Sequence, residues 1–375
     1  MRGEARPPPR AARMTQDPGL ASWLHLTLTP GLGPVTIREL LKKFGLPENV
    51  LALKRAELAR LAPAEALKAL DSDDVARAVE HALEWASQPG CAVVTLADET
   101  YPKLLLEIAD PPTLLYARGR MELLGAAAVL AIVGSRNATT QGERDAERFA
   151  RALSEAGLTI VSGLALGIDA AAHRGGLAAQ GSTIAVLGTG IDIVYPARNA
   201  ALFEEIAAKG LLISEFPLGT KAVAQNFPRR NRLISGLAQG CLVVEAAPAS
   251  GSLITARAAA EQGREVFALP GSIHSPLAKG CHALIKAGAK LVESAEDVLS
   301  ELSGFRRSGF ASTTAPQPAA VEEPLLAHMG FDPIDVDSLC ARTAMPVERV
   351  NAELLRLELA GRVAALPGGF FQRLS

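Results

Sequence analysis

The sequence lacks the features that would place the chain in a membrane or export it. Its longest apolar run, Ala126 to Val133, has eight residues, whereas a membrane-spanning helix needs about 20. The start of the chain is rich in Arg and Pro, and no apolar stretch of the kind that a secretion signal requires follows it. We therefore expect a cytoplasmic protein without a membrane segment. Residues 1–19 are expected to form a disordered tail, with either Met1 or Met14 as the first residue.

Cysteine is also scarce. The 375 residues include four, and they are far apart in the sequence, so no CxxC motif or Cys/His cluster exists. This spacing argues against a zinc site and against a disulfide framework. We expect no metal and no cofactor. The four are Cys91, Cys241, Cys281 and Cys340.

An excess of positive charge is missing as well. Lys and Arg total 38 and Asp and Glu total 40, so the net charge is −2. A basic protein is the usual electrostatic signature of nucleic-acid binding, and the total charge by itself argues against that function. The apolar fraction of 49% supports a packed core. The length suggests two or three domains.

What the sequence does contain is a succession of different patterns. Residues 20–88 read as a helical domain. In residues 89–302, nine apolar runs of strand length alternate with helical stretches, which predicts an extended Rossmann-like α/β domain with a doubly wound, mostly parallel sheet. Residues 303–321 are rich in Ser, Thr, Ala, Gly and Pro and read as a linker. Residues 322–375 predict helices followed by a hairpin, as in a winged-helix domain.

One turn in the helical domain has two readings. Gly31-Leu32-Gly33-Pro34 precedes a helical pattern, and such a turn can present backbone N–H groups to a phosphate. A turn between two helices of a small bundle explains the same glycines. The sequence does not decide between them.

The junctions between strands and helices are the places to look for a ligand. In a parallel sheet, ligands bind where the carboxyl ends of the strands meet the helices that follow. The junctions of this chain carry Gly, Ser or Thr, which allow a phosphate to approach the backbone. None is a Walker A loop, and none is the dinucleotide fingerprint with its downstream acid. The sequence therefore argues against an NTPase and against a nicotinamide enzyme.

Basic side chains are concentrated at these junctions. Residues 216–244 and 266–292 contain no Asp or Glu, and a third acid-free window, residues 130–142, surrounds Arg136. A basic rim on an otherwise neutral domain suits a polyanion bound along one edge. The Lys and Arg residues of the two long windows are Lys221, Arg229, Arg230, Arg232, Lys279, Lys286 and Lys290.

Phe227 is unusual in this setting because its neighbours in sequence, from Asn226 to Arg232, are mostly polar or basic. A ring beside guanidinium groups can stack on an exposed nucleobase, an interaction worth about 1–3 kcal/mol. The alternative is a ring that packs beneath the loop.

Three acidic or basic side chains suggest catalysis only weakly. Asp169 and His173 are spaced i, i+4 and resemble an acid–base pair, although a structural role explains both. Glu245 follows a strand and would be the carboxylate of a Rossmann-fold enzyme that cuts the N-glycosidic bond of a nucleotide. That hydrolase is the alternative function, but the sequence lacks the PGGxGTxxE-type signature of such enzymes.

Together, these junctions resemble the DprA/Smf family of bacterial DNA-processing proteins. The resemblance covers residues 90–302 and rests on several long motifs in one order. The motifs are AIVGSR (131–136), SGLALGIDAAAH (162–173), VLGTGIDIVYP (186–196), SEFPLGT (214–220), NFPRRNRLISGL (226–237), EAAPASGSLITARAAAEQGREVFALPG (245–271) and GCHALIKAGA (280–289).

The resemblance implies a single-stranded DNA-binding protein that is not an enzyme. It also implies that residues 20–88 are the family's helical extension, of the sterile-alpha-motif or helix-hairpin-helix type. Members of the family protect incoming single strands in natural transformation and help to load the RecA recombinase past single-strand-binding protein, and they form homodimers through the Rossmann domain. Arg136 matches the family's phosphate-binding arginine, and Phe227 matches its base-contacting phenylalanine. His282 departs from the pattern, because many members carry Asn there. The expected nucleic-acid-binding residues are Ser135, Arg136, Ser162, Gly163, Lys221, Asn226, Phe227, Arg229, Arg230, Asn231, Arg232, Ser250, Gly251, Ser252, Lys279 and Lys286.

The last domain has a charge that does not suit a DNA reader. Residues 322–375 contain eight Asp and Glu against five Arg, whereas a winged helix that reads DNA is expected to be basic on its recognition helix. The acidic charge therefore argues against a third function, that of a sequence-specific regulator that uses the winged helix. We hypothesise that the domain contacts protein, or the basic rim of the Rossmann domain, rather than duplex DNA.

Overall fold

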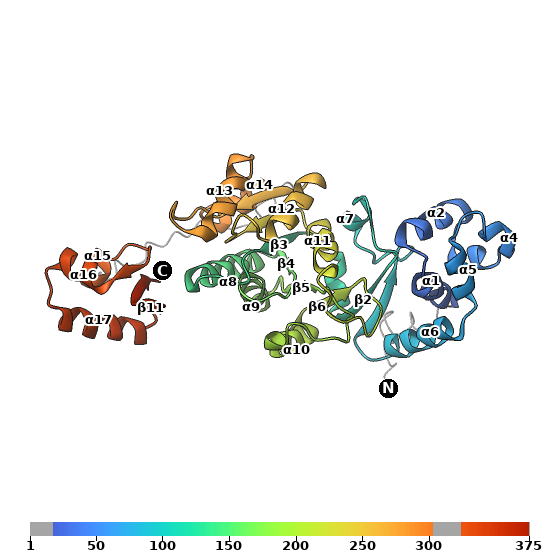
Figure 1. Cartoon of the computed structure of the whole chain (residues 1–375), viewed down its shortest axis with the longest axis horizontal. Coiled ribbons are helices and arrows are strands. Elements are labelled where there is room, and N and C mark those ends of the chain that lie inside the picture. Colours follow the sequence, from blue (N-terminus) through green and yellow to red (C-terminus); the bar gives the residue numbers. More distant parts are fainter. Residues whose placement is uncertain (1–17, 303–323, 375) are drawn as a thin grey trace, which may run out of the picture.

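The computed structural model describes residues 18–302 and 324–374, and Figure 1 shows the arrangement of the three folded parts. The central part is built on a nine-stranded sheet with the order β1-β2-β6-β5-β4-β3-β7-β8-β9. The strands from β6 to β9 in this order are parallel, whereas β1 and β2 run antiparallel to their neighbours. The bounds are β1 Cys91–Thr95, β2 Leu114–Gly119, β3 Val129–Val133, β4 Thr159–Ser162, β5 Thr183–Val186, β6 Leu211–Ser214, β7 Gly240–Val243, β8 Glu265–Ala268 and β9 Lys290–Leu291.

Helices cover both faces of this sheet, and β3 shows why. Its residues alternate between two hydrophobic clusters: Ala131 belongs to the cluster with α11 and α12, whereas Leu130 and Ile132 belong to the cluster with α8 and α9. A strand buried on both faces must be apolar throughout. The fold class predicted from the apolar runs is confirmed. The helices are α7 Lys103–Leu106, α8 Thr140–Glu155, α9 Ile168–Leu177, α10 Ala200–Lys209, α11 Asn226–Leu237, α12 Ser252–Glu261, α13 Lys279–Lys286 and α14 Ala295–Glu301.

The helical N-terminal part is not a separate unit. Leu24 of α1 and Trp85 of α6 lie in one hydrophobic cluster with Phe203 and Leu212, which belong to α10 and β6. The helices between them enclose a second, smaller cluster that includes Ile37. The boundary at residue 88 therefore divides the sequence but not the core. The helices are α1 Pro18–Leu28, α2 Pro34–Phe44, α3 Pro47–Leu51, α4 Arg55–Leu58, α5 Ala64–Leu70 and α6 Asp73–Ala86.

The C-terminal part has its own hydrophobic cluster, which includes Leu339 and Leu354. It contains α15 (Pro324–His328), α16 (Val336–Thr343) and α17 (Val347–Leu359), and a three-stranded sheet of β10 (Ile334–Asp335), β12 (Phe370–Arg373) and β11 (Val363–Leu366). This is the predicted winged helix. Leu355 and Leu359, on the outward face of its recognition helix α17, are 58% and 83% exposed.

Two of the segments named from the sequence lie outside the described residues: the linker and nearly all of the N-terminal tail. Within the ranges that are described, none of the helices has the length and apolar character to cross a membrane.

Candidate nucleic-acid interface

The strand order places the sequence-predicted junctions at one edge of the sheet. The chain passes from β3 to β4 on one side and returns to β7 on the other, so the loops after β3 and β7 flank the switch point of the sheet. Ser135, directly after β3, donates its backbone N–H to the backbone oxygen of Glu245, 2.7 Å away. The carboxyl ends of β3, β4, β5 and β7 and the first turn of α11 therefore meet.

A cavity of about 140 Å³ opens at this edge. It lies between the loops after β3, β4 and β5 and the first turn of α11, and none of its lining residues is acidic. Phe227 forms one wall and packs so closely on Gly188 that a Cβ there would lie 2.7 Å from the ring. The lining residues are Arg136, Gly163, Leu164, Ala165, Leu166, Leu187, Gly188, Thr189, Tyr195, Pro196, Phe227 and Arg230.

Two aromatic rings and a guanidinium group meet at the cavity. The ring of Tyr195 lies 5.4 Å from that of Phe227, centroid to centroid, with an interplanar angle of 37°. The guanidinium carbon of Arg136 is 5.7 Å from the Phe227 centroid, within cation–π range. Tyr195 is 45% exposed. Tyr195 is not among the site residues predicted from the sequence, although a large ring in a loop that follows a buried strand is a signal for it.

Arg230 lines the cavity but is otherwise enclosed by the protein. It is 3% exposed, and its Nη1 donates to the backbone oxygens of Gly163, at 2.7 Å, and Val186. Burial lowers its pKa to about 10, so it stays charged at neutral pH. A Cβ on Gly163 would lie 2.6 Å from this guanidinium. Arg230 and Gly163 thus hold each other in place at the cavity, and whether the Arg230 side chain contacts DNA stays a prediction.

Ser162 and Ser135 are turned inward in a similar way. The Ser162 hydroxyl donates to the backbone oxygen of Ile132, 2.6 Å away, and Ser162 is fully buried. The Ser135 hydroxyl accepts from the backbone N–H of Asn137 at 3.1 Å, and Ser135 is also buried. Their hydroxyl groups shape the loops.

The Asp169–His173 pair has no exposed reactive group. Asp169 accepts from the backbone N–H groups of Gly163, at 3.1 Å, and Ala165, at 3.4 Å, and burial raises its pKa. His173 accepts from the N–H of Leu164 through Nε2, at 3.2 Å, and its Nδ1 is 2.7 Å from the Thr183 hydroxyl. Burial lowers the pKa of His173 to about 3, so the ring is neutral. These bonds hold the loop after β4.

Glu245 is directed away from the cavity. Its two carboxylate oxygens accept from the backbone N–H of Thr139, at 2.9 Å, and from the Thr139 hydroxyl, at 2.6 Å. The same hydroxyl accepts from the N–H of Gly142 and so caps α8. The carboxylate that the alternative hydrolase requires is thus engaged in hydrogen bonds at the start of α8.

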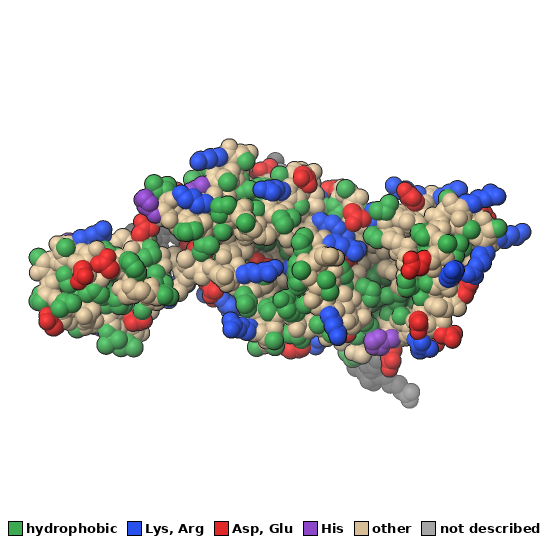
Figure 2. Space-filling view, in the orientation of Figure 1, with side chains coloured by type: hydrophobic (Ala, Val, Ile, Leu, Met, Phe, Trp, Pro, Cys, Tyr) green, Lys and Arg blue, Asp and Glu red, His purple; other side chains and the backbone are tan. Residues whose placement is uncertain are grey.

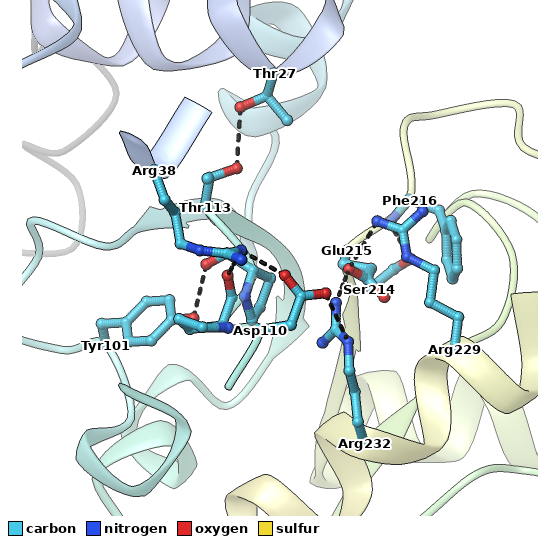
Figure 3. Close-up of polar contacts among 12 residues, drawn as sticks. Thr27, Arg38, Tyr101, Asp110, Thr113, Ser214, Glu215, Phe216, Arg229 and Arg232 are labelled. Atoms are coloured by element: carbon cyan, nitrogen blue, oxygen red, sulfur yellow. Dashed lines mark hydrogen bonds and ion pairs between the residues drawn. The ribbon is translucent and has the colours of Figure 1, made fainter. Parts of the chain in front are cut away.

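The other two arginines of α11, Arg229 and Arg232, differ in how firmly their side chains are held and in their exposure to solvent. Arg232 donates to Oε2 of the buried Glu215 at 2.6 Å, whereas the Arg229 side chain reaches the same atom only at 3.4 Å and is 47% exposed. Figure 3 shows both arginines converging on Glu215. Arg229 also lies over the Phe216 ring, 5.5 Å from its centroid. Arg229 is therefore open to solvent, and Arg232 is held inside the protein.

A second group of predicted residues lies across the switch point, after β7 and β8. The hydroxyls of Ser250 and Ser252 are 2.7 Å apart, and Asn231 of α11 donates to the backbone oxygen of Gly251 at 3.4 Å. Lys279 begins α13, and its ammonium donates to the backbone oxygen of Ile273. Lys286 ends the same helix, about 10 Å further along its axis, so it lies away from this group.

Two other predicted residues are Lys221, in the segment that leads into α11, and Asn226, the first residue of that helix. Lys221 is exposed and Asn226 is half-buried. His282 places Nε2 3.0 Å from the backbone oxygen of Gly271. In the middle of the visible face of the sheet domain, Figure 2 shows separate Lys and Arg groups on a mostly uncharged surface.

Comparisons with known proteins agree with this geometry. A sequence model described as DNA recombination-mediator protein A matches residues 92–303, and one described as the DprA winged helix domain matches residues 311–369. Protein Smf of Escherichia coli is 45% identical over 302 residues, which cover 78% of this chain and 80% of the relative.

Two solved structures have the same fold. DNA processing protein A of Streptococcus pneumoniae superimposes with a TM-score of 0.67 at 39% identity, covering 75% of this chain and 98% of the other. DNA processing protein A of Helicobacter pylori, whose structure was described for its single-stranded DNA binding mode, gives 0.51 at 31% identity, over 55% of this chain and 93% of the other. The chain belongs to the DNA recombination-mediator protein A family, the family of the DprA and Smf proteins.

Proposed function

We propose that the chain is a single-stranded DNA-binding recombination mediator. One observation carries the proposal: at the carboxyl edge of the sheet, Phe227 and the exposed Tyr195 line a cavity without acidic residues, with Arg136 over the Phe227 ring. Stacking rings beside a cation suit a base that is free of a duplex, together with the phosphate beside it. The Helicobacter pylori relative, described for binding single-stranded DNA, supports the same ligand.

The residues divide into three proposed roles. Phe227 and Tyr195 stack on a base. Arg136 and the exposed Arg229 attract the phosphates, and Lys221, Asn226, Asn231, the Ser250–Ser252 turn and Lys279 extend the path along the edge. The predicted residues whose side chains are turned inward act as supports. These are Ser135, Ser162, Arg230 and Arg232, together with Gly163, which has no side chain and accepts from Arg230 through its backbone oxygen.

We further propose that the protein acts in the cytoplasm without catalytic turnover, as a homodimer that helps to load RecA onto single strands coated by single-strand-binding protein. The support is the family resemblance, and the absence of turnover is also supported by Glu245 and His173, whose polar atoms are bonded inside the fold. No residue of the described chain is assigned to the RecA contact or to the dimer.

The test is the affinity of the full chain for labelled oligo-dT, a matched duplex and free nucleotides, measured by fluorescence anisotropy over a salt series. We expect oligo-dT to bind more tightly than duplex, and the logarithm of its binding constant to fall linearly with the logarithm of salt concentration. Equal affinity for duplex would reject the proposal. So would the accumulation of hydrolysis products from nucleotides.

A further inference from the structure

The helical N-terminal part is connected to the helix that carries Phe227 by a chain of charged side chains. Arg38 of α2 places Nη1 2.6 Å from Oδ1 of Asp110, and also donates to the backbone oxygen of Pro111 at 3.0 Å. The other oxygen of Asp110 lies 3.3 Å from Nε of Arg232, on α11. Figure 3 shows Asp110 between the two arginines. One carboxylate therefore bridges two parts of the chain that are nearly 200 residues apart in sequence.

The bridge continues into the core. Arg232 also donates to Glu215 at 2.6 Å, and the Glu215 side chain is 3% exposed. Four buried atoms here have no hydrogen-bond partner among the described residues: Oδ1 of Asp110, Nε and Nη1 of Arg232, and Oε1 of Glu215. The contacts of Asp110 with the two arginines are therefore ion pairs rather than hydrogen bonds. Arg232 is thus held by few bonds in a setting of low dielectric constant, where each bond has a large influence.

The segment that carries Asp110 is itself fixed on several sides. The Tyr101 hydroxyl donates to the backbone oxygen of Pro112 at 2.7 Å, and the Thr27 and Thr113 hydroxyls are 3.3 Å apart. Both contacts are drawn in Figure 3. Since Thr27 belongs to α1, the position of Asp110 depends on the packing of the helical part as well as on Arg38.

Two arginines add polar anchors to α11, which also packs in the core through Leu233, Ile234 and Leu237. Arg230 anchors the helix to the loops after β4 and β5, and Arg232 anchors it to Glu215 and Asp110. Phe227, in the first turn of α11, is the residue that packs on Gly188 and lines the cavity. A rotation of α11 that followed the loss of the Arg232 anchor would move the ring relative to Tyr195 and Arg136.

We propose that Asp110 is a positioning residue, through which Arg38 of the helical part sets the orientation of α11 and thereby the affinity for single-stranded DNA. This inference rests on the proposed function, because it assigns a control to the same site. It gives the helical part a role in DNA affinity that needs no contact between that part and DNA.

The direction in which one substitution changes the affinity distinguishes a positioning role from a purely electrostatic effect. Asp110→Asn removes a negative charge near the site, so a purely electrostatic effect would tighten binding to oligo-dT and steepen its salt dependence. Positioning predicts the opposite: binding about threefold to tenfold weaker with an unchanged salt slope. Tighter binding, or an affinity equal to that of the unsubstituted chain, would overturn the inference.

A double-mutant cycle tests the connection to the helical part. Arg38→Gln is expected to weaken binding to the same degree as Asp110→Asn, and the double substitution to weaken it no further, because both break one bridge. Additive effects would contradict the bridge. The matched controls are Arg55→Gln and Asp71→Asn, which make the same charge changes in an ion pair that stays within the helical part; these should leave binding unchanged.

A second measurement reports on how well the Phe227 ring stacks on a base. An oligo-dT that carries 2-aminopurine should show a smaller fluorescence change at saturating protein for Asp110→Asn and for Arg38→Gln, because Phe227 no longer stacks as well. An unchanged signal at saturation would count against positioning.

Melting temperatures are measured for each variant, and binding is compared well below them. If Phe227→Ala weakens binding but these variants do not, this inference is wrong and the proposed function stands; if the unsubstituted chain shows no preference for single strands, both are wrong.

Discussion

Two arginines of the site, Arg136 and Arg230, have opposite surroundings. Arg136 is exposed and faces the Phe227 ring, whereas Arg230 donates to backbone oxygens inside the protein. An exposed arginine can exchange water for a phosphate, whereas a buried one that left its carbonyl partners would leave them unsatisfied. The two arginines are therefore suited to different roles, although the sequence presents both simply as basic residues of the acid-free windows.

The separate roles of the ring and the guanidinium can be measured. Arg136→Ala is expected to weaken binding to oligo-dT and to reduce the salt slope by about one unit, because one phosphate contact is lost. Phe227→Ala is expected to cost about 1–3 kcal/mol with a nearly unchanged slope, because stacking releases no counterions. Anisotropy titrations at several salt concentrations give both quantities.

The control for this pair is Arg151→Ala, which removes the same charge from the exposed side of α8, where Arg151 pairs with Glu155. It should leave both quantities unchanged. If Phe227→Ala changed the slope as much as Arg136→Ala did, the division between stacking and phosphate contact would be wrong.

His173 makes a contribution to stability that depends on pH. Its pKa is about 3 in the folded chain, and burial is the main cause, whereas an unfolded chain protonates its histidines at about pH 6.5. Between these values only the unfolded state takes up the proton, so stability falls as the pH decreases from 6.5. The effect approaches about 1.4 kcal/mol per pH unit.

The comparison with His173→Gln isolates this effect. The variant should be less stable at pH 7, because the bonds to Leu164 and Thr183 are altered, but should lose about 2–3 kcal/mol less than the unsubstituted chain between about pH 6.5 and 4.5. Urea unfolding at each pH measures the difference. Asp169, whose pKa is raised and which opposes the trend, is present in both proteins and cancels. Parallel pH profiles would show that His173 is not the group responsible.

At the scale of elements, the sheet was predictable because burial on both faces leaves a long apolar run. All nine predicted strands are present, and the winged helix is present as predicted. The antiparallel direction of β1 and β2 was not predictable, because an apolar run does not encode the direction of its neighbour. The acid-free windows fall at the carboxyl edge of the sheet, since they follow strands whose ends meet there, and this edge is the proposed binding site.

The features of the candidate site that could not be predicted from the sequence depend on contacts between residues that are far apart along the chain. Tyr195 lies in a loop after β5 and meets Phe227, 32 positions later, only because α11 returns to that edge. The inward direction of Ser162 and Arg230 likewise depends on which carbonyl groups surround them. Spacing along the chain carries no information about either. The shared core of α1, α6 and the sheet was missed for the same reason.

At the scale of the whole molecule, the net charge of −2 averages unlike regions. Arg136, Lys221, Arg229 and Lys279, all from the acid-free windows, lie around one edge of the sheet, whereas the winged helix has more acidic than basic residues. A protein of this kind is not suited to being coated by DNA over its whole surface. It is suited to holding one strand along a narrow path.

The winged helix provides the test of this view. Its hydrophobic cluster contains only its own residues, so a chain that ends at residue 302 keeps the other clusters complete. The outward face of α17 presents Leu355 and Leu359 together with Glu348, and not a row of cations. We therefore expect the shortened chain to bind oligo-dT within about twofold of the full chain, with the same salt slope. Duplex binding should be equally unaffected. A loss of about tenfold or more for either DNA, with a reduced slope, would mean that the winged helix contributes phosphate contacts of its own.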